Sequence, residues 1–357
     1  MSDNRATGAN WFTRLVRRQY FWGIVAIALL LAVNMIKDPR YLSIGFNASN
    51  GALVGNVIDI LRAAAPIMMI AIGMCLVIAT SGIDLSVGSV MVVAGAVSMQ
   101  FLSSAPNTIG SALAALALSL GIAVVLGLFN GFMVSVVGLQ PFISTLVMMM
   151  AGRGIAKVIT GGQNTAATND PFRWIANGYV FGLPVVFLLA LLIVILIGVL
   201  VRRSALGLMI EAIGMDPMAA RLAGVNRRGL LLAVYAISAL MAGIAGIFAT
   251  ASVMTVDVSR TGDQLEMDAI LAVVIGGTSL AGGKFNITGA TIGALLIATL
   301  DKTVVFLGVS SSATPAFKAI VIVVLCLLQS DRIRSAFKRR SAPAAPTAQQ
   351  KEEVAAS

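Results

Sequence analysis

Long apolar stretches with almost no charge run through most of this 357-residue sequence, and they exclude a soluble globular fold. Hydrophobic residues make up 58% of the chain and charged residues 11%, whereas soluble domains contain about 25% charged residues. At about 20 apolar residues per membrane-spanning helix, this material suffices for roughly ten spans joined by short connections. A separate catalytic domain of about 100 residues does not fit into the remainder. The sequence therefore predicts an all-α, polytopic membrane protein.

The apolar segments that we interpret as spans are 20–36, 64–80, 87–102, 109–137, 141–159, 180–201, 229–251, 267–281, 287–309 and 315–328. Some are short and one is long for a straight span, so we expect broken or re-entrant helices among them. The first segment is longer than a signal-peptide core of about 7–15 residues and lacks a small-residue cleavage pattern, so we interpret it as a membrane helix.

The distribution of positive charge predicts which parts of the chain face the cytoplasm. Lys and Arg are concentrated in segment 202–228 and after the last span, and short loops with such an excess stay in the cytoplasm. Ten crossings place both regions on the same side as the N-terminus. The predicted organisation is a cytoplasmic N-terminal segment (1–19), a transmembrane domain (20–330) that contains the cytoplasmic loop 202–228, and a disordered cytoplasmic tail (331–357).

The residue inventory argues against catalysis and metal binding. Histidine is absent, which excludes histidine-dependent catalytic pairs, histidine-ligated zinc and histidine proton relays. The two cysteines, Cys75 and Cys326, lie in separate apolar runs, and we interpret both as small core side chains. The formal net charge is +10, and the basic residues that cause it cluster beside apolar segments. This placement indicates how the chain is oriented in the membrane and not that it binds nucleic acid. We predict no catalytic residue and no metal site.

Three polar interruptions of the apolar sequence are candidates for function. The first contains Gly82, Asp84, Ser86 and Gly88 between two apolar runs. Free backbone groups and a carboxylate inside the membrane must either be buried in protein, where they find hydrogen-bond partners, or face a water-filled cavity. The segment is therefore either a broken helix that lines or gates a pathway, or a simple cap in which Asp84 or Ser86 starts the next helix.

The second interruption is rich in glycine and spans residues 275–284. Its glycines are Gly276, Gly277, Gly282 and Gly283. It fails the pattern of a phosphate-binding loop, because Thr278 replaces the first glycine and Phe285 follows the lysine. We interpret it as a tight turn or gating element between two spans. Both interruptions fall on the cytoplasmic side, which does not favour an inverted repeat that relates them.

The third interruption, 204–225, is long for a membrane loop and has a helical pattern. Asp216 and Pro217 can start a short helix as N-cap and first-turn proline, and Gly224 can end it. Alone, such a segment is either an amphipathic helix on the membrane surface or a helix that docks into a groove of a partner.

Together, segments 82–88, 211–224 and 276–283 resemble the permease subunits of bacterial ABC importers of the ribose, xylose and galactofuranose type, over about residues 20–330. Further likeness lies in 58–66, 140–142, 151–154 and 266–274, and it is strongest to galactofuranose permeases. The resemblance implies import of a monosaccharide, with galactofuranose as the first expectation.

The same resemblance implies partners. The central loop would hold a cytoplasmic coupling helix that docks on a separate ATP-binding subunit, which would carry ATP and Mg²⁺, so this chain needs no cofactor. The implied interface residues are Glu211, Ala212, Gly214, Ala219, Ala220, Arg221 and Gly224. A periplasmic or extracellular sugar-binding protein, a second permease copy or paralogue, and membrane lipid complete the partners, without nucleic acid.

A sugar is neutral and rich in hydroxyl groups, so its route needs hydrogen-bonding side chains and little charge. The pathway candidates are Asp84, Asn130, Gln140, Phe142, Gln163, Asn164 and Asp268. Asp84 and Asp268 could act as gates, and each candidate could equally be a packed polar group. The alternative function is an ion-coupled secondary sugar transporter, which would use Asp84, Asp268 and Asp301 as ion sites but has no need of a coupling helix.

Overall fold

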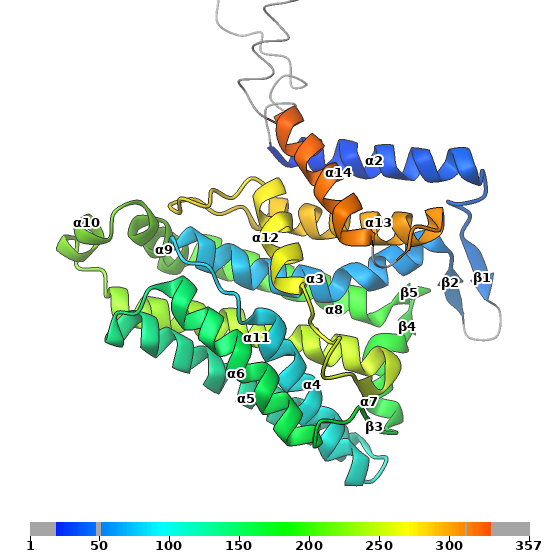
Figure 1. The fold of residues 1–357 in the computed structure, drawn as a ribbon, viewed down its shortest axis with the longest axis horizontal. Helices are drawn as coiled ribbons and strands as arrows, with labels where there is room; N and C mark the ends of the chain where they lie inside the picture. Colours follow the sequence, from blue (N-terminus) through cyan, green and yellow to red (C-terminus); the bar gives the residue numbers. More distant parts are fainter. Residues whose placement is uncertain (1–18, 48–50, 311–312, 330–357) are drawn as a thin grey trace, which may run out of the picture.

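The computed structural model describes residues 19–47, 51–310 and 313–329, which form a bundle of helices (Figure 1). The helices are α2 (Gln19–Lys37), α3 (Asn56–Ala79), α4 (Val87–Ser104), α5 (Ile109–Phe132) with its π-helical continuation η1 (Met133–Val137), α6 (Pro141–Thr160), α7 (Asp170–Asn177), α8 (Val185–Arg203), α9 (Ala205–Met215), α10 (Pro217–Leu222), α11 (Arg227–Val253), α12 (Leu265–Ile275), α13 (Ile287–Leu307) and α14 (Thr314–Gln329).

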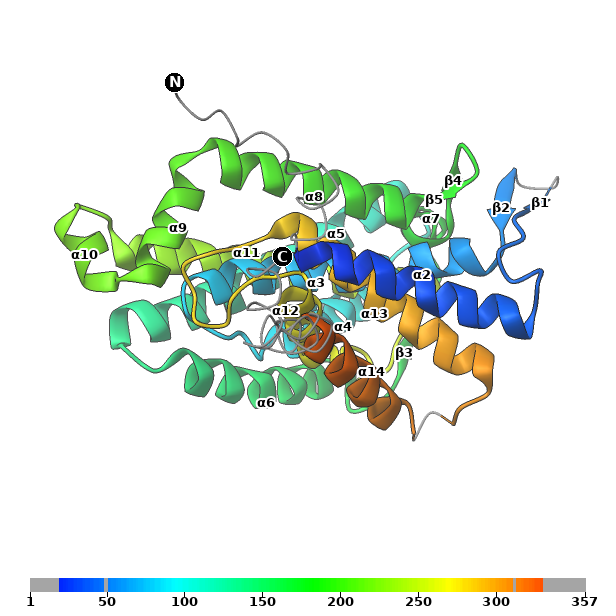
Figure 2. The same ribbon diagram turned by 90° about the horizontal axis from the view of Figure 1, so that it is seen from above.

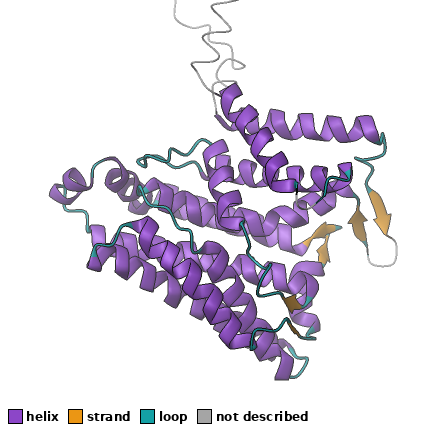
Figure 3. Cartoon of the chain, in the orientation of Figure 1, coloured by secondary structure: helices purple, strands orange, loops and turns teal. Residues whose placement is uncertain are grey.

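Short antiparallel strand pairs complete the described chain. They are β1 (Gly45–Asn47) with β2 (Ala52–Val54), β3 (Thr165–Ala166) with β6 (Thr255–Val256), and β4 (Tyr179–Val180) with β5 (Leu183–Pro184). Figure 3 shows that the strands gather at the end of the bundle that carries α7. α9 and α10 lie at the opposite end (Figures 1 and 2). We refer to these as the α7 end and the α10 end.

Seven helices in the described part of the chain are long and apolar enough to cross a membrane: α3, α4, α5 with η1, α6, α8, α11 and α13. This confirms the prediction of an all-α, polytopic membrane protein. Three further predicted spans coincide with α2, α12 and α14, so the number of ten stays a prediction. The predicted terminal segments 1–19 and 331–357, with their basic residues, lie outside the described residues except for Gln19.

The predicted span 267–281 is wrong in its second half. The helix there, α12, ends at Ile275, because a pair of glycines and a turn with positive φ at Gly277 follow it. Its 11 residues extend over about 16 Å, roughly half of the hydrocarbon thickness of a membrane. The expectation of broken helices is therefore confirmed at α12.

The centre of the bundle is built from two sets of helices that exchange contacts. α3 is followed by a non-helical segment, 80–86, and then by α4 and α5, whereas α11 is followed by segment 254–264, α12 and α13. α11 packs against α3, α4 and α5, and α3 packs against α11, α12 and α13. Segments 80–86 and 254–264 thus occupy corresponding places in the two sets, each after the first helix of its set.

Burial differs sharply between helices. α3 and α4 are buried over most of their length, and Cys75 lies in this core as predicted. The side chain of Cys326 in α14 lies outside the described residues. α6 and α8 are largely exposed and carry apolar side chains such as Val147 and Leu192 on their outer faces. In a membrane, such faces contact lipid or another subunit.

Candidate functional site

The segment between α3 and α4 holds a buried carboxylate. Asp84 is 1% exposed and accepts hydrogen bonds from Ser238 Oγ at 2.8 Å, Ser86 Oγ at 2.5 Å and the Ser86 backbone N–H at 3.0 Å. The Asn130 amide donates to Ser86 Oγ at 2.8 Å. We call these four residues the Asp84 cluster, which ties segment 80–86 to α5 and α11.

The Asp84 cluster combines two predicted pathway residues, Asp84 and Asn130, with Ser86. All are buried, so in this structure the cluster locks helices together and does not line an open channel. The simple capping interpretation is wrong for Ser86, whose side chain forms no cap hydrogen bond with α4. Asp84 accepts one backbone N–H in front of α4, but its remaining bonds reach Ser86 Oγ and Ser238, so its role extends beyond a local cap.

The remaining pathway candidates do not converge on this cluster. Gln140 and Phe142 are exposed at the start of α6, and Gln163 and Asn164 are exposed just after its end. The 20 residues of α6 separate the two pairs by about 30 Å.

Asp268 is held in an ion-pair triad that connects three helices. Lys318 Nζ of α14 lies 2.9 Å from Asp268 Oδ2 of α12 and 2.7 Å from Asp301 Oδ1 of α13. Asp268 thus has a protein cation as its partner. Among the described residues, no group of three or more His, Cys, Asp or Glu side chains could hold a metal ion.

The three motifs of the sequence meet at the α10 end of α3. Ser81 Oγ lies 3.0 Å from the carbonyl oxygens of both Gly214 and Ala281. The Gly283 N–H donates to the Ala79 carbonyl at 2.9 Å. Gly214 fits because it has no side chain: a Cβ atom there would overlap the Ala79 oxygen and the Gly283 nitrogen. α9 and the glycine-rich turn are therefore in direct contact with the end of α3 and the start of segment 80–86.

The glycine-rich turn has the geometry predicted for it. Gly277, Gly282 and Gly283 have positive φ, a region that favours glycine, and Gly276 packs against the backbone of Gly289. Gly82 is also buried, next to Tyr235.

α10 has the predicted start and end. Asp216 Oδ1 accepts the backbone N–H groups of Met218 at 2.8 Å and Ala219 at 3.1 Å, Pro217 is the first helical residue, and Gly224 follows the helix with φ +85°. A cleft of about 850 Å³ separates α10 from η1 and is lined by Arg221, among others.

The predicted interface residues differ in exposure. Ala219, Arg221 and Gly224 are exposed, Glu211 and Ala212 are half-buried, and Gly214 and Ala220 are buried. Beside them, the large apolar side chains of Leu208, Met215, Met218 and Leu222 are 66–84% exposed. Exposed apolar groups ringed by arginines are typical of a docking surface.

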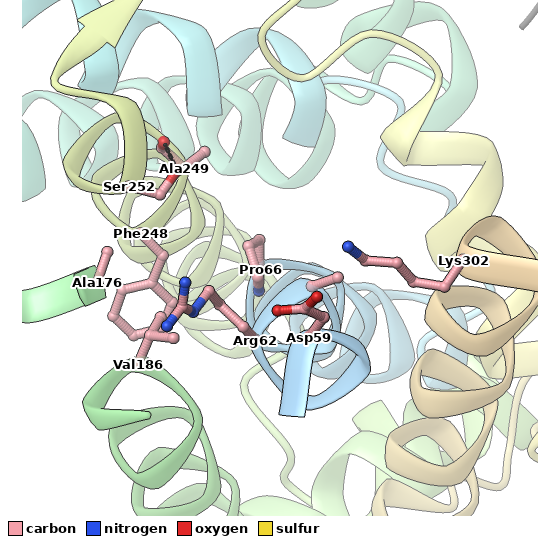
Figure 4. A pocket seen from close by; sticks show the side chains of 10 residues that line it. Asp59, Arg62, Pro66, Ala176, Val186, Phe248, Ala249, Ser252 and Lys302 are labelled. Carbon is pink, nitrogen blue, oxygen red and sulfur yellow. Dashed lines mark hydrogen bonds between the residues drawn. The ribbon is translucent and has the colours of Figure 1, made fainter. Parts of the chain in front are cut away.

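A separate cavity of about 370 Å³ opens at the α7 end, between α3, α8, α11 and α13 (Figure 4). Asp59 and Arg62 from α3 and Lys302 from α13 line it. The Arg62 guanidinium hydrogen-bonds the Tyr179 hydroxyl and lies over its ring. None of the predicted pathway residues lines this cavity.

Sequence reasoning overlooked a polar junction around Arg153, Asp263 and Glu266. Arg153 Nη2 lies 3.5 Å from Asp263 Oδ1, and both belong to the region where α4, α6 and α12 meet. An arginine within the apolar run of α6 was the available signal, because ionisable residues within spans are rare and usually functional.

The family model and the relatives that match this chain are all transport permeases. The family described as "Branched-chain amino acid transport system / permease component" matches residues 56–328. A fructose import permease of Bifidobacterium longum is 51% identical over 335 residues, 93% of each chain. A galactofuranose transporter permease of Escherichia coli is 40% identical over 332 residues, covering 91% of this chain and 95% of the relative. A ribose import permease of Escherichia coli is 34% identical over 338 residues, covering 93% of this chain and all of the relative. No solved structure gives a significant match.

Proposed function

Because the chain belongs to this family of permease components, we propose that it is the membrane-spanning subunit of an ATP-driven importer that carries a monosaccharide across the bacterial cytoplasmic membrane. Neither the family match nor the relatives support the ion-coupled alternative. The relatives are transport subunits, so ATP hydrolysis belongs to a separate partner that binds ATP and Mg²⁺.

The proposed topology has ten crossings. The seven long apolar helices are joined by α2, α12 and α14, which supply the remaining three. The α10 end then faces the cytoplasm together with both termini, because the loop around α9 and α10 carries Arg202, Arg203, Arg221, Arg227 and Arg228. The α7 end faces outward, where a sugar-binding protein would deliver the substrate.

The contact of Gly214 with the end of α3 is the observation that carries the mechanism. α9 and α10 form the proposed coupling element, and the exposed Met218 and Leu222 offer apolar anchors for the ATP-binding subunit. When ATP binding draws two such elements together, α9 pulls on Ser81 and shifts segment 80–86. The Asp84 cluster then has to break or move with it, which couples the nucleotide state to the membrane-embedded helices.

Two permease copies, or this chain and a paralogue, enclose the sugar route in this proposal. The exposed surface of α6, which carries large apolar side chains such as Val147 and Met150, is available for the second copy to pack against.

Fructose ranks first among the candidate substrates and galactofuranose second. The fructose permease is the more similar of the two relatives, at 51% against 40% identity. The sequence motifs favoured galactofuranose and did not single out fructose. Both sugars are neutral and rich in hydroxyl groups, as a route with little net charge requires.

Uptake of labelled sugars into membrane vesicles tests the proposed function. The vesicles contain the permease with its co-purifying proteins, and ATP and an ionophore are varied independently over a panel of fructose, galactofuranose and ribose. We expect uptake that requires ATP and survives the ionophore. Uptake that ignores ATP and collapses with the ionophore would identify a secondary transporter instead.

A further inference from the structure

The long helix α4 and the short helix α12 begin side by side near the centre of the bundle (Figure 1). Gly88 in the first turn of α4 and Gly262 just before α12 touch so closely that a Cβ atom on either would overlap the carbonyl oxygen of the other. Neither helix start has a side-chain cap, since Ser86 and Gln264 form no cap hydrogen bond. Two sets of first-turn N–H groups and two positive helix ends therefore converge at one place.

A carboxylate with one oxygen that lacks a hydrogen-bond donor lies against this junction. Glu266, in the first turn of α12, is 8% exposed. Its Oε2 lacks a partner among the described residues and lies 2.6 Å from the position that a Cβ atom on Gly88 would take. A buried carboxylate oxygen without a donor is costly, so the site is suited to a ligand that brings one.

Charged and polar side chains form the open rim of the junction. Arg153 of α6 reaches across with Nη1 at 3.4 Å from the Thr261 carbonyl and Nη2 at 3.5 Å from Asp263. The Asp263 side chain is 59% exposed, and Gln264 beside it is also exposed. Arg153 lies within the apolar length of α6, where exposure of these groups to lipid would be expensive. The rim is therefore expected to face water in the transport pathway.

We propose that this junction is a monosaccharide-binding site within the membrane, where Arg153, Asp263 and Gln264 bind sugar hydroxyl groups and Glu266 accepts a hydrogen bond from the deepest one. The residue types fit the substrate class: a carboxylate, a guanidinium and an amide offer acceptors and donors in pairs, as vicinal hydroxyl groups do. The inference rests on the proposed function and assigns it a binding site that the sequence candidates did not include.

Concentration-dependent, ATP-driven uptake in proteoliposomes tests this site. Glu266→Gln and Asp263→Asn should each raise the KM for the transported sugar about tenfold or more, the typical effect of losing a charge-assisted hydrogen bond. Lys157→Gln is the matched control, because Lys157 is exposed one helical turn beyond Arg153 and should leave the KM unchanged. Permease content of the vesicles is measured for each variant, so that poor insertion is not mistaken for weak binding.

Labelling keeps the site testable if the uptake variants insert poorly. In a chain with Cys75→Ala and Cys326→Ala, Gln264→Cys should react with a hydrophilic maleimide, and the transported sugar should slow this reaction. Protection by sodium ions and not by sugar would overturn the proposal in favour of a cation site.

The two proposals fail in different ways. If wild-type vesicles import no sugar with ATP, the proposed function itself fails. If they import sugar while the variants keep the wild-type KM and sugar gives no protection, only this site is refuted.

Discussion

Single residues decide how closely the functional segments can approach. Gly214 is the clearest case, because α9 reaches the end of α3 and the glycine-rich turn only where no side chain intervenes. Ser81 fixes the same contact from the other side through the carbonyl oxygens of Gly214 and Ala281. We therefore expect the proposed coupling element and segment 80–86 to move together.

Gly214→Ala should interfere with this attachment. The added methyl group overlaps backbone atoms, and overpacking of this kind costs about 1–3 kcal/mol. We expect ATP-dependent sugar uptake to fall while ATP hydrolysis by the assembled complex continues, measured side by side in proteoliposomes. Gly121→Ala is the control, because Gly121 has open space where a Cβ atom would lie. Normal uptake by the Gly214 variant would refute a rigid coupling contact.

The sequence could identify the polar residues but not their partners. Asp84 and Asn130 stand out as polar groups in apolar surroundings, and both prove to be buried. Their connection through Ser86 and Ser238 joins positions up to 154 residues apart, which depends on how α4, α5 and α11 pack. Arg153 and Asp263 remained unpaired in sequence reasoning for the same reason.

At the scale of whole elements, apolar length was a good guide to the long helices and a poor one to the interrupted helices. The apolar run after Met267 continues to Ala281, but the helix ends at Ile275, since backbone geometry and not hydrophobicity ends it. The start of α12 was predicted within two residues, at Met267 against the observed Leu265, because the polar segment 254–264 ends there. Both interruptions became interpretable only through their contacts with α4 and α13.

The ion-pair triad helps to attach α14 to its neighbours, beside the apolar packing of Phe317 and Val321. Lys318→Met should leave Asp268 and Asp301 without their shared cation, and removal of one partner from a buried ion pair costs about 3 kcal/mol or more. We expect a lower unfolding temperature in detergent. Combining it with Asp268→Asn and Asp301→Asn should restore much of the loss, because no uncompensated charge remains. An unchanged unfolding temperature in the single variant would show that the triad contributes nothing to stability.

At the scale of the whole molecule, the two ends have opposite characters. The α10 end combines exposed arginines with large exposed apolar side chains, whereas the α7 end carries the strand pairs and the cavity beside Arg62. α12 brings the chain back to the α10 end, as the contact between Gly283 and Ala79 requires. α13 and α14 then determine on which side the C-terminal tail emerges.

Single cysteines in the cysteine-free chain can test the ten-crossing topology. Met218→Cys and Ser279→Cys should react with a membrane-impermeant maleimide only in inside-out vesicles, and Phe181→Cys and Ser310→Cys only in intact cells, since all four positions are exposed at opposite ends of the bundle. Phe181 and Met218 calibrate the two sides, because a single long apolar helix, α8, separates them. If Ser279→Cys reacts with the maleimide in intact cells, as Phe181→Cys does, α12 does not complete a crossing. If Ser310→Cys reacts only in inside-out vesicles, as Met218→Cys does, the assignment of α13 as a membrane crossing is wrong.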